Sequence, residues 1–233
     1  MKKKLFPILV IFMLVSACGP QPIRAFDQFN LNQNAQRVYY YQAYQPSSSD
    51  PAKTIKATFQ LAEVVVERTV VPSYVVAHAK RQLKLIQADP NWSGDTTTQV
   101  TEIWYVISGQ RVYSQKTAVD PTNIKVSDMT LSYDFPLTPG KTWCPQLYDP
   151  KDASHKQITD CRLSGQREVI GPATFTSGTD SFTDCYNLVD HYSDGQIFQR
   201  FCTGVGVVML SFDHVGTNFG FKQNLSTYLI GTP

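Results

Sequence analysis

The chain has 233 residues, of which 42% are apolar, 12% aromatic and 17% charged. This apolar and aromatic content excludes a disordered chain and is sufficient for one substantial hydrophobic core. The formal charge is +2, but three of the 21 basic residues are consecutive lysines at the N-terminus. Without these lysines the chain has 18 basic and 19 acidic residues, so its bulk charge gives no reason to expect nucleic-acid binding.

The N-terminus has the organisation of an export signal. Lys2, Lys3 and Lys4 form a positive region, and the apolar stretch Leu5–Val15 follows directly. A membrane-spanning helix needs about 20 apolar residues, so this stretch is too short for a stable span. We therefore expect residues 1–17 to be a signal peptide that is removed on export.

The end of this signal has a more specific pattern. Val15-Ser16-Ala17-Cys18 resembles the lipobox of bacterial lipoproteins, an apolar residue and two small residues before a cysteine. The resemblance implies that a diacylglyceryl group is attached to the Cys18 thiol, that cleavage occurs before Cys18, and that the new amino group is acylated. Two or three acyl chains make a lasting membrane anchor. Many Gram-negative lipoproteins carry a retaining aspartate where Gly19 stands here, so the resemblance implies the outer membrane if the cell is Gram-negative.

The remainder of the chain divides into two parts by composition. Residues 18–35 are rich in Gln, Asn and Pro and have no periodicity, so we expect a flexible tether that lifts the domain off the bilayer. From Gln36 onward, strand signals recur to the C-terminus. This pattern predicts a single antiparallel β-domain over residues 36–233.

Strand signals begin with Arg37–Tyr44, which is rich in aromatic and β-branched residues. Residues 55–61 alternate apolar and polar side chains with the period of a half-buried strand. Residues 97–108 and 111–116 flank the turn residues Gly109-Gln110, which predicts a compact hairpin.

The stretch Tyr74–Ala88 fits two kinds of periodicity. Its apolar residues alternate with polar residues as in a strand, but some of them also share one face of a helix. Its Ala, Lys, Gln and Leu residues favour a helix as well. We expect a strand here because the segments on both sides are strands.

Further strand signals follow in the C-terminal half, separated by turn residues. They lie at Met129–Phe135, Ile158–Gly171, Phe182–Tyr192, Gln196–Phe201, Val207–His214 and Asn218–Ile230. Strands follow strands at close spacing without a β-α-β alternation. The sequence therefore predicts an all-β fold, an antiparallel meander curled into a half-barrel, a barrel or a sandwich.

Four cysteines lie beyond Cys18, and we expect them to be structural. They are Cys144, Cys161, Cys185 and Cys202. Export implies an oxidising compartment, and neither a C-x-x-C pair nor a histidine at ligand spacing indicates a metal site. The first two and the last two cysteines are each 17 positions apart around a turn signal, which favours disulfides within each pair. The crossed arrangement, 144 with 202 and 161 with 185, remains open.

Three motifs in the second half resemble a pattern of uncharacterised bacterial envelope lipoproteins. The motifs are Pro136-Leu137-x-Pro139-Gly140-Lys141-x-Trp143, then Gly171-Pro172-Ala173-Thr174-Phe175 with Phe182-x-Asp184-Cys185, and finally Gly204-Val205-Gly206-Val207-Val208. The resemblance covers about residue 131 to the C-terminus. It implies a curved antiparallel sheet similar to the LolA/LolB-like lipoprotein carriers, whose concave face holds acyl chains. Because the motifs are turns, the resemblance concerns the fold and implies no catalytic residue.

We find no catalytic motif in the chain. Its four histidines, His78, His155, His191 and His214, lie outside any H-E-x-x-H motif, and no G-x-S-x-G motif occurs. Asp190 and Asp213 each precede a histidine, but neighbours on a strand point to opposite faces and make poor acid–base pairs. The basic residues Lys80, Arg81 and Lys84 are expected on a solvated face.

The sequence therefore favours a non-catalytic β-domain that is membrane-tethered in a bacterial cell envelope. We expect it to hold an apolar or lipid-like ligand in a concave sheet, or to present a surface to another envelope protein. A purely structural component of an envelope complex and a hydrolase with an unrecognised site are the alternatives. We expect no cofactor, no metal and no nucleic-acid partner.

Overall fold

The computed structural model describes residues 25–145, 161, 165–192 and 195–232. Within them, twelve strands form one antiparallel sheet in the order β6-β5-β4-β3-β2-β1-β12-β11-β10-β9-β8-β7. The strands are β1 (Gln36–Pro46), β2 (Thr54–Val71), β3 (Tyr74–Ala88), β4 (Gln99–Ser108), β5 (Arg111–Gln115), β6 (Thr130–Asp134), β7 (Thr142–Trp143), β8 (Gln166–Ser177), β9 (Asp180–Tyr192), β10 (Gly195–Cys202), β11 (Gly206–His214) and β12 (Gly220–Leu229). Two helical segments are short, α1 (Ala25–Gln28) and the 3-10 turn η1 (Val126–Asp128). The predicted all-β antiparallel fold is confirmed.

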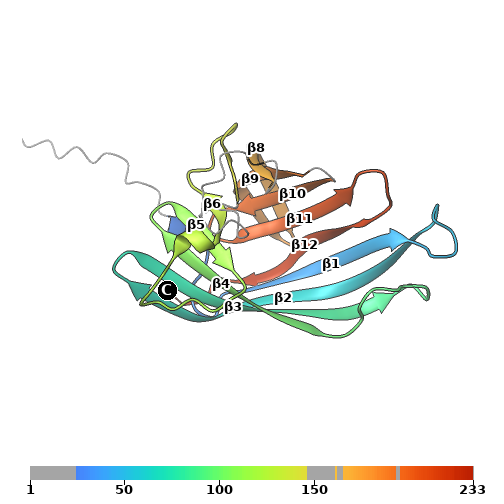
Figure 1. Ribbon diagram of the computed structural model, residues 1–233, viewed down its shortest axis with the longest axis horizontal. Helices are drawn as coiled ribbons and strands as arrows, with labels where there is room; N and C mark the ends of the chain where they lie inside the picture. Colours follow the sequence, from blue (N-terminus) through green and yellow to red (C-terminus); the bar gives the residue numbers. More distant parts are fainter. Residues whose placement is uncertain (1–24, 146–160, 162–164, 193–194, 233) are drawn as a thin grey trace, which may run out of the picture.

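The sheet curls into a nearly closed barrel (Figure 1). β1 to β4 form one wall, β8 to β12 form the facing wall, and β5 and β6 lie between them at one end. The two edge strands of the sheet meet at a seam. There the backbone N–H of Leu131 on β6 donates to the carbonyl of Pro145 at 2.5 Å, and Nε1 of Trp143 donates to the carbonyl of Leu131 at 3.3 Å.

The ambiguous stretch Tyr74–Ala88 is a strand, β3, as expected. β2 continues ten residues beyond its predicted end at residue 61, to Val71. Its pairing with β3 shifts register between Val65 and Glu67, so the strict alternation of inward and outward residues breaks there. The apolar alternation stops earlier, after Leu61, because the next inward residue, Glu63, is charged, and the prediction ends there.

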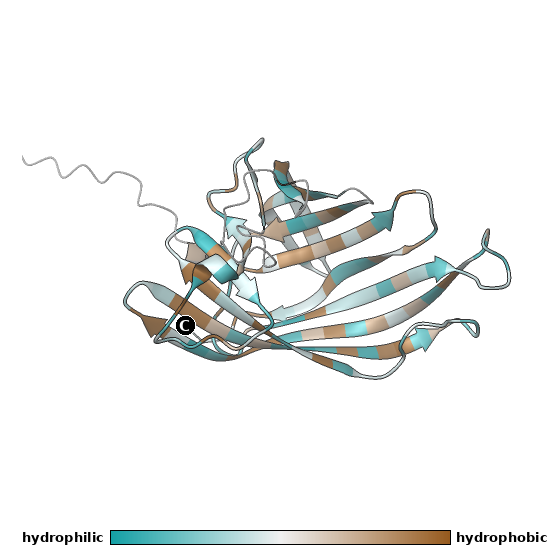
Figure 2. Cartoon of the chain, viewed as in Figure 1, coloured by the Kyte–Doolittle hydropathy of each residue, from teal (hydrophilic) through white to brown (hydrophobic). Residues whose placement is uncertain are grey.

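Hydropathy alternates along the long strands, as Figure 2 shows for β1 to β4. Around β3 and β4, however, residues on both faces of the sheet are buried. Ala77 and its partner Tyr105 face the barrel interior, while the neighbouring partners Val76 and Val106 face outward and pack in the same core cluster as Val119. The chain between β5 and β6 thus contributes to a small second layer outside the barrel.

Residues 25–35 fill one end of the barrel. Ala25, Phe29, Leu31 and Ala35 are all buried in the main core, and the Phe29 ring lies 5.3 to 5.9 Å from the rings of three barrel residues. The prediction of a flexible tether over residues 18–35 is therefore wrong for residues 25–35, while residues 18–24 lie outside the described part. The segment shows no periodicity because it fills a space inside the sheet and is not part of the sheet.

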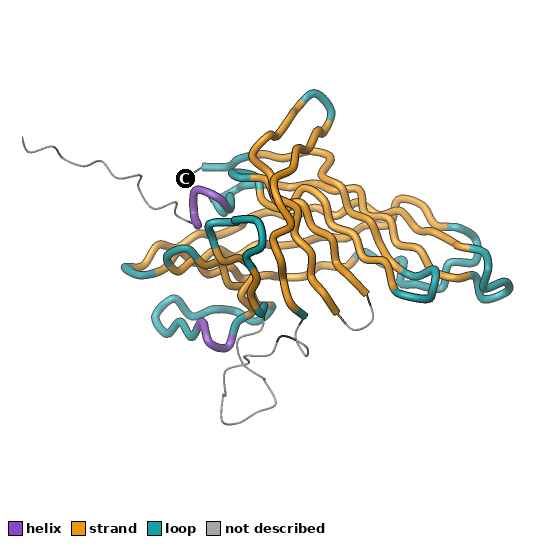
Figure 3. Tube along the Cα trace, turned by 90° about the horizontal axis from the view of Figure 1, so that it is seen from above, coloured by secondary structure: helices purple, strands orange, loops and turns teal. Residues whose placement is uncertain are grey.

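Both views place α1 beside the C-terminus at this filled end (Figures 1 and 3). The β1–β2 hairpin turn lies at the opposite end. The barrel therefore has one end that carries the N-terminal segment and another end formed by hairpin turns.

Both disulfides join the cysteines that are 17 positions apart. Cys185 and Cys202 are register partners on β9 and β10, so their bond crosses one hairpin. Cys144 follows β7 directly and is bonded to Cys161, which precedes β8. This is the pairing that the spacing favours, and the crossed arrangement does not occur in the structure.

The burial of the N-terminal segment leads to a first prediction. Phe29 is 3% exposed, so replacing Phe29 with Ala leaves a cavity among the rings of Tyr105, Tyr133 and Phe201. We expect a loss of about 3–5 kcal/mol in the free energy of unfolding, measured by urea denaturation. The matched control is Tyr40→Ala, because Tyr40 is 59% exposed on the outer face. Equal and small effects of the two changes would mean that residues 25–35 do not belong to the folded core.

Candidate functional site

A cavity of about 320 Å³ lies inside the barrel. Every strand except β7 contributes to its lining, because residues two apart on a strand share a face and register partners share that face too. The lining includes the charged or amide side chains of Arg37, Glu63, Arg81, Arg167, Asp190 and Gln199. It also includes the apolar side chains of Leu61, Ile103, Ile197, Val207 and Leu210.

The charged centre of the cavity consists of three side chains that lie side by side on the neighbouring strands β1, β2 and β3; they are called the charged row below. Arg37 is the partner of Glu63, and Glu63 is the partner of Arg81. Nη2 of Arg37 donates to Oε1 of Glu63 at 2.5 Å, and Nε of Arg81 donates to Oε2. The Tyr105 hydroxyl accepts from Nη2 of Arg81 at 2.9 Å and donates to Oε2 of Glu63 at 3.2 Å. One carboxylate therefore pairs with two guanidinium groups.

The protonation states in this row follow from its contacts. Burial by itself would raise the pKa of Glu63, but the guanidinium groups of Arg81 and Arg37 lower that pKa to about 2. Burial raises the pKa of Tyr105 to about 12 and raises the pKa of Tyr39 as well. At neutral pH the carboxylate is therefore ionised and both phenols are neutral.

Arg37 also fixes the N-terminal segment inside the barrel. Its Nη1 donates to the carbonyl of Asn30 at 3.2 Å and to the carbonyl of Val205 at 2.9 Å, and its guanidinium lies 5.3 Å from the centre of the Phe29 ring. Gly206 has a φ of 101°, and a Cβ there would lie 2.9 Å from Nη1 of Arg37. Only glycine combines this backbone conformation with the space for the guanidinium.

Arg167 connects the facing wall to the seam of the barrel. Its Nε and Nη2 each donate to a carboxylate oxygen of Asp190 at 2.5 Å, in a bidentate pair between β8 and β9. Its Nη1 donates to the carbonyl of Ser132 on β6 at 2.5 Å. The guanidinium also lies over the rings of Tyr133 and Trp143, so this side chain holds β6 against β8.

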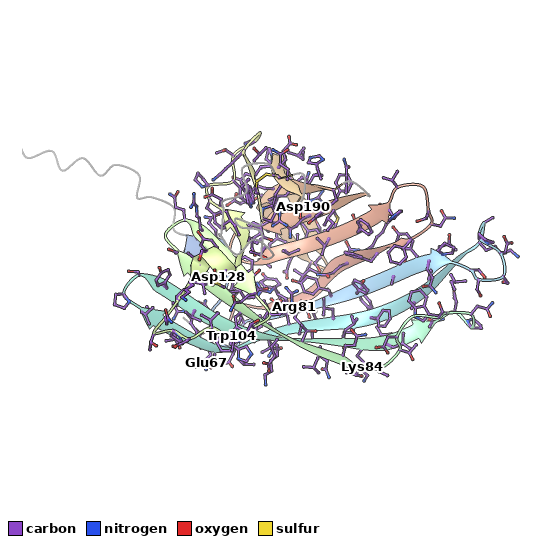
Figure 4. All side chains as sticks on the ribbon, in the orientation of Figure 1. Glu67, Arg81, Lys84, Trp104, Asp128 and Asp190 are labelled. Carbon is purple, nitrogen blue, oxygen red and sulfur yellow. A yellow bond between two sulfur atoms is a disulfide. The ribbon has the colours of Figure 1, made fainter. Side chains whose placement is uncertain are left out.

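The charges around the cavity do not cancel. Among the described residues that line it, three arginines face two carboxylates, so the lining has a net charge of +1 with its phenols neutral. The three arginine side chains also differ in exposure: Arg37 is 4% exposed, Arg167 13% and Arg81 39%. Figure 4 shows Arg81 and Asp190 between the walls, whereas Glu67 and Lys84 lie on the outer side of one wall. Arg81 is thus the most accessible of the three cations.

Toward the hairpin end, the inner face becomes aromatic. The Tyr41 ring lies 5.9 Å from the Phe59 ring and 5.3 Å from the Phe221 ring, and Phe212 lies 6.1 Å from Phe221. Tyr41, Phe212 and Phe221 are only half-buried. The interior is therefore charged in its middle and apolar toward the end that lies opposite the N-terminal segment.

None of the three described histidines lines the cavity, although the His214 ring lies 6.3 Å from the Phe212 ring. His191 contacts Glu168 at 3.1 Å and Gln196 at 3.3 Å, on the face opposite its neighbour Asp190, as expected for adjacent strand residues. Nδ1 of His214 lies 3.1 Å from the Thr217 hydroxyl. His78 stacks on Trp104, with ring centres 4.3 Å apart, on the outer face. His155 lies outside the described residues.

The prediction that Lys80, Arg81 and Lys84 share a solvated face is wrong for Arg81, which faces the cavity. A signal for this was present in the sequence. Inward positions on β3 are two apart, and Arg81 occupies the position between the apolar residues Ala79 and Leu83. Glu63 and Arg37 similarly continue the inward series of β2 and β1.

Trp143 is buried, as expected for a core anchor, and Phe175 packs against the second hydrophobic cluster, which contains Cys185 and Cys202. Cys18 lies outside the described residues. Within the described ranges, no group of three or more His, Cys, Asp or Glu residues is placed to hold a metal ion. No helix in the same ranges is both long and apolar enough to cross a membrane.

No protein-family model matches the chain, and no curated protein matches it. The solved structures that are similar to it include the following two. One is from Bacteroides fragilis, inferred to be an exported protein and described as having a YmcC-like fold, with a TM-score of 0.47 and 13% identity, covering 87% of this chain and 98% of that chain. The other, inferred to be a lipoprotein of Parabacteroides distasonis, has a TM-score of 0.44 and 13% identity, covering 86% and 97%. At these values neither similarity assigns a site or an activity.

The low pKa of Glu63 predicts a specific acid sensitivity. A carboxyl group with an ordinary pKa near 4.3 when unfolded and about 2 when folded stabilises the protein above pH 5, and this stabilisation is lost as the pH falls toward 2. We expect the loss to be about 3 kcal/mol, measured as the fall in the urea unfolding free energy between pH 5 and pH 2.

Glu63→Gln isolates this contribution from those of other carboxylates. The variant leaves Arg37 buried without a counter-ion, so we expect it to lose about 3–5 kcal/mol at pH 7 and to show a smaller further loss in acid. Glu102→Gln is the control, since Glu102 is half-exposed on the outer face. An acid dependence that is the same in all three proteins would contradict the prediction.

Proposed function

We propose that this protein is a lipoprotein of the bacterial cell envelope, anchored through lipidated Cys18, whose barrel binds a lipid-like ligand without catalysing a reaction. The observation that carries the proposal is the cavity inside the barrel, which combines paired charges with an apolar lining. Ligand sites in proteins are concave spaces that combine an apolar lining with fixed polar groups, and this cavity combines both, with more charged groups than such sites commonly have.

The charged side chains in the cavity favour a lipid-like ligand that has a polar group of its own. A ligand that is apolar throughout would cover ionised groups without forming hydrogen bonds to them, which is costly. An amphiphile avoids this cost, because its polar head meets the charged row and its apolar part meets the aromatic inner face. The proposal is therefore an amphiphilic ligand.

The surroundings of the histidines support a role in binding over a role in hydrolysis. Hydrolysis by a Ser–His–Asp type of site needs a nucleophile, a base and a carboxylate in one hydrogen-bonded series. His191 contacts a carboxylate and an amide, and His214 contacts a hydroxyl. In the part of the chain that the structure describes, these contacts do not make such a series.

The binding proposal can be tested by filling the cavity. Leu61 lines the cavity, so Leu61→Trp places a large side chain in it. We expect the affinity for an amphiphilic fluorophore, dansylaminoundecanoic acid, measured by fluorescence titration, to fall by about tenfold or more, which corresponds to about 1.4 kcal/mol. Tyr40→Trp, on the outer face of the neighbouring strand, should bind like the unaltered protein. Thermal unfolding of each variant checks that it is folded.

Two results would contradict this proposal. One is equal affinity in all three proteins, which would place the fluorophore outside the cavity. The other is the absence of binding together with recovery of a stoichiometric protein partner from solubilised membranes, which would favour the structural role in an envelope complex. Solvent extraction of protein purified from membranes, followed by mass spectrometry, identifies any ligand that is retained.

The anchor can be tested independently of the ligand. In a bacterial host, the full chain should incorporate radiolabelled palmitate and fractionate with membranes, because the lipobox resemblance implies acylation of Cys18. The Cys18→Ala variant should do neither, while Cys185→Ala serves as the control for a cysteine outside the lipobox. A full chain that remains soluble and unlabelled would overturn the membrane-anchored part of the proposal.

A further inference from the structure

We infer that Arg81 binds the head group of an anionic amphiphile, a carboxylate or a phosphate, and that the apolar part of this ligand lies on the aromatic inner face toward Tyr41 and Phe221. This inference rests on the proposed function, because it names the chemical class of the ligand in the cavity. It depends on three observations: the charge of the lining, the Nη1 group of Arg81 that its contacts with Glu63 and Tyr105 leave unused, and a buried amide oxygen of Gln199 without a hydrogen-bond partner among the described atoms.

The charge of the lining favours an anion. Glu63 is shared between Arg37 and Arg81, and Asp190 pairs with Arg167, so one positive charge has no counter-ion of its own. Hydrogen bonds between guanidinium groups and carboxylates or phosphates are among the strongest in proteins, and they gain strength away from bulk water. A single anionic group would make the lining neutral.

Of the three arginines, Arg81 is the one placed to receive that group. Arg37 uses both amino groups on Glu63 and on two backbone carbonyls, and Arg167 uses its three nitrogens on Asp190 and Ser132. Arg81 makes its contacts with Glu63 and Tyr105 through Nε and Nη2. Its Nη1 is not engaged in these contacts, and its side chain is also the most exposed of the three.

Gln199 gives a second polar contact for a head group. The residue is 8% exposed and lines the same cavity, yet its Oε1 has no hydrogen-bond partner among the described atoms. A buried acceptor without a donor is unfavourable, so a hydroxyl or N–H of a ligand in this cavity would be stabilised there. The lining thus offers a cation for an anionic group and an acceptor for a neighbouring donor.

The size of the cavity agrees with a head group in the cavity and an apolar part beyond it. Its volume of about 320 Å³ is at the lower end of the range of about 300–1,000 Å³ found for ligand pockets. Tyr41, Phe212 and Phe221 continue the inner face toward the hairpin end and are half-buried. An alkyl chain that leaves the cavity on this side would meet aromatic rings.

The test compares amphiphiles that differ only in the head group. Octanoate, octyl phosphate and neutral octanol are titrated into the full-length protein by calorimetry at pH 7 and low salt. We expect at least one of the two anions to bind about tenfold more tightly than octanol, and the stronger one identifies the head group as a carboxylate or a phosphate. Acetate and inorganic phosphate, which lack an alkyl chain, should bind more weakly than the matching amphiphiles.

Arg81→Gln should remove the preference for the anion and leave the affinity for octanol nearly unchanged. Lys84→Gln is the matched control, because it removes one positive charge from the outer face of the same strand. It should keep the preference. Arg81→Lys, which keeps the charge but loses the planar guanidinium, should retain part of the preference for the anion.

The outcomes separate this inference from the proposed function. If octanol and both anions bind equally to the unaltered protein, Arg81 is not a head-group site, while the barrel still binds an amphiphile. If none of the three binds, both the inference and the ligand proposal fail. An anion preference that survives in folded Arg81→Gln also overturns the inference, since the charge then acts from another residue.

Discussion

A sheet of twelve strands that curls into a barrel encloses more space than its own side chains can fill. About eight strands already give an interior that is just wide enough for side chains to pack, and the diameter increases with strand number. In this protein residues 25–35 occupy part of the additional space at one end, and a row of ion pairs occupies part of its middle. The rest remains as a cavity. The position of the N-terminal segment, the buried arginines and the candidate binding site all follow from this one constraint.

The ion pairs in the middle of the barrel also connect its strands to one another and to the N-terminal segment. Ionised groups are costly to bury unless each is paired and hydrogen-bonded, and Glu63 meets this condition by contacting two arginines and a tyrosine. Arg37 extends the same network to Asn30 and Val205, and Arg167 extends its own pair to the seam strand β6. The groups that line the cavity are therefore also groups that hold the closed barrel together. Substitutions at Arg37 or Glu63 are expected to affect folding, and Arg81 is the better position at which to separate binding from stability.

Much of the fold could be predicted from the sequence, because strands with one buried face carry a period of two. The antiparallel meander follows from this pattern, the hairpin at Gly109 follows from its turn residues, and the strand at residues 74–88 follows from the strands on both sides of it. A period of two does not describe the bulge near Val65, where the register shifts, or residues 25–35, which pack irregularly in the core. The site could be predicted less well. The alternation with Ala79 and Leu83 indicates an inward position for Arg81, but its two charged neighbours favour a solvated face, and the register with Glu63 decides between the two.

The filled end of the barrel limits how any bound molecule can move. Phe29, Phe135 and Phe201 pack together there, and the described chain begins at this end with Ala25. Because this end is filled, a ligand bound in the cavity as proposed would enter and leave toward the hairpin end, beside Tyr41 and Phe221. Passage of a ligand from one end of the barrel to the other would require the packed side chains at the filled end to move.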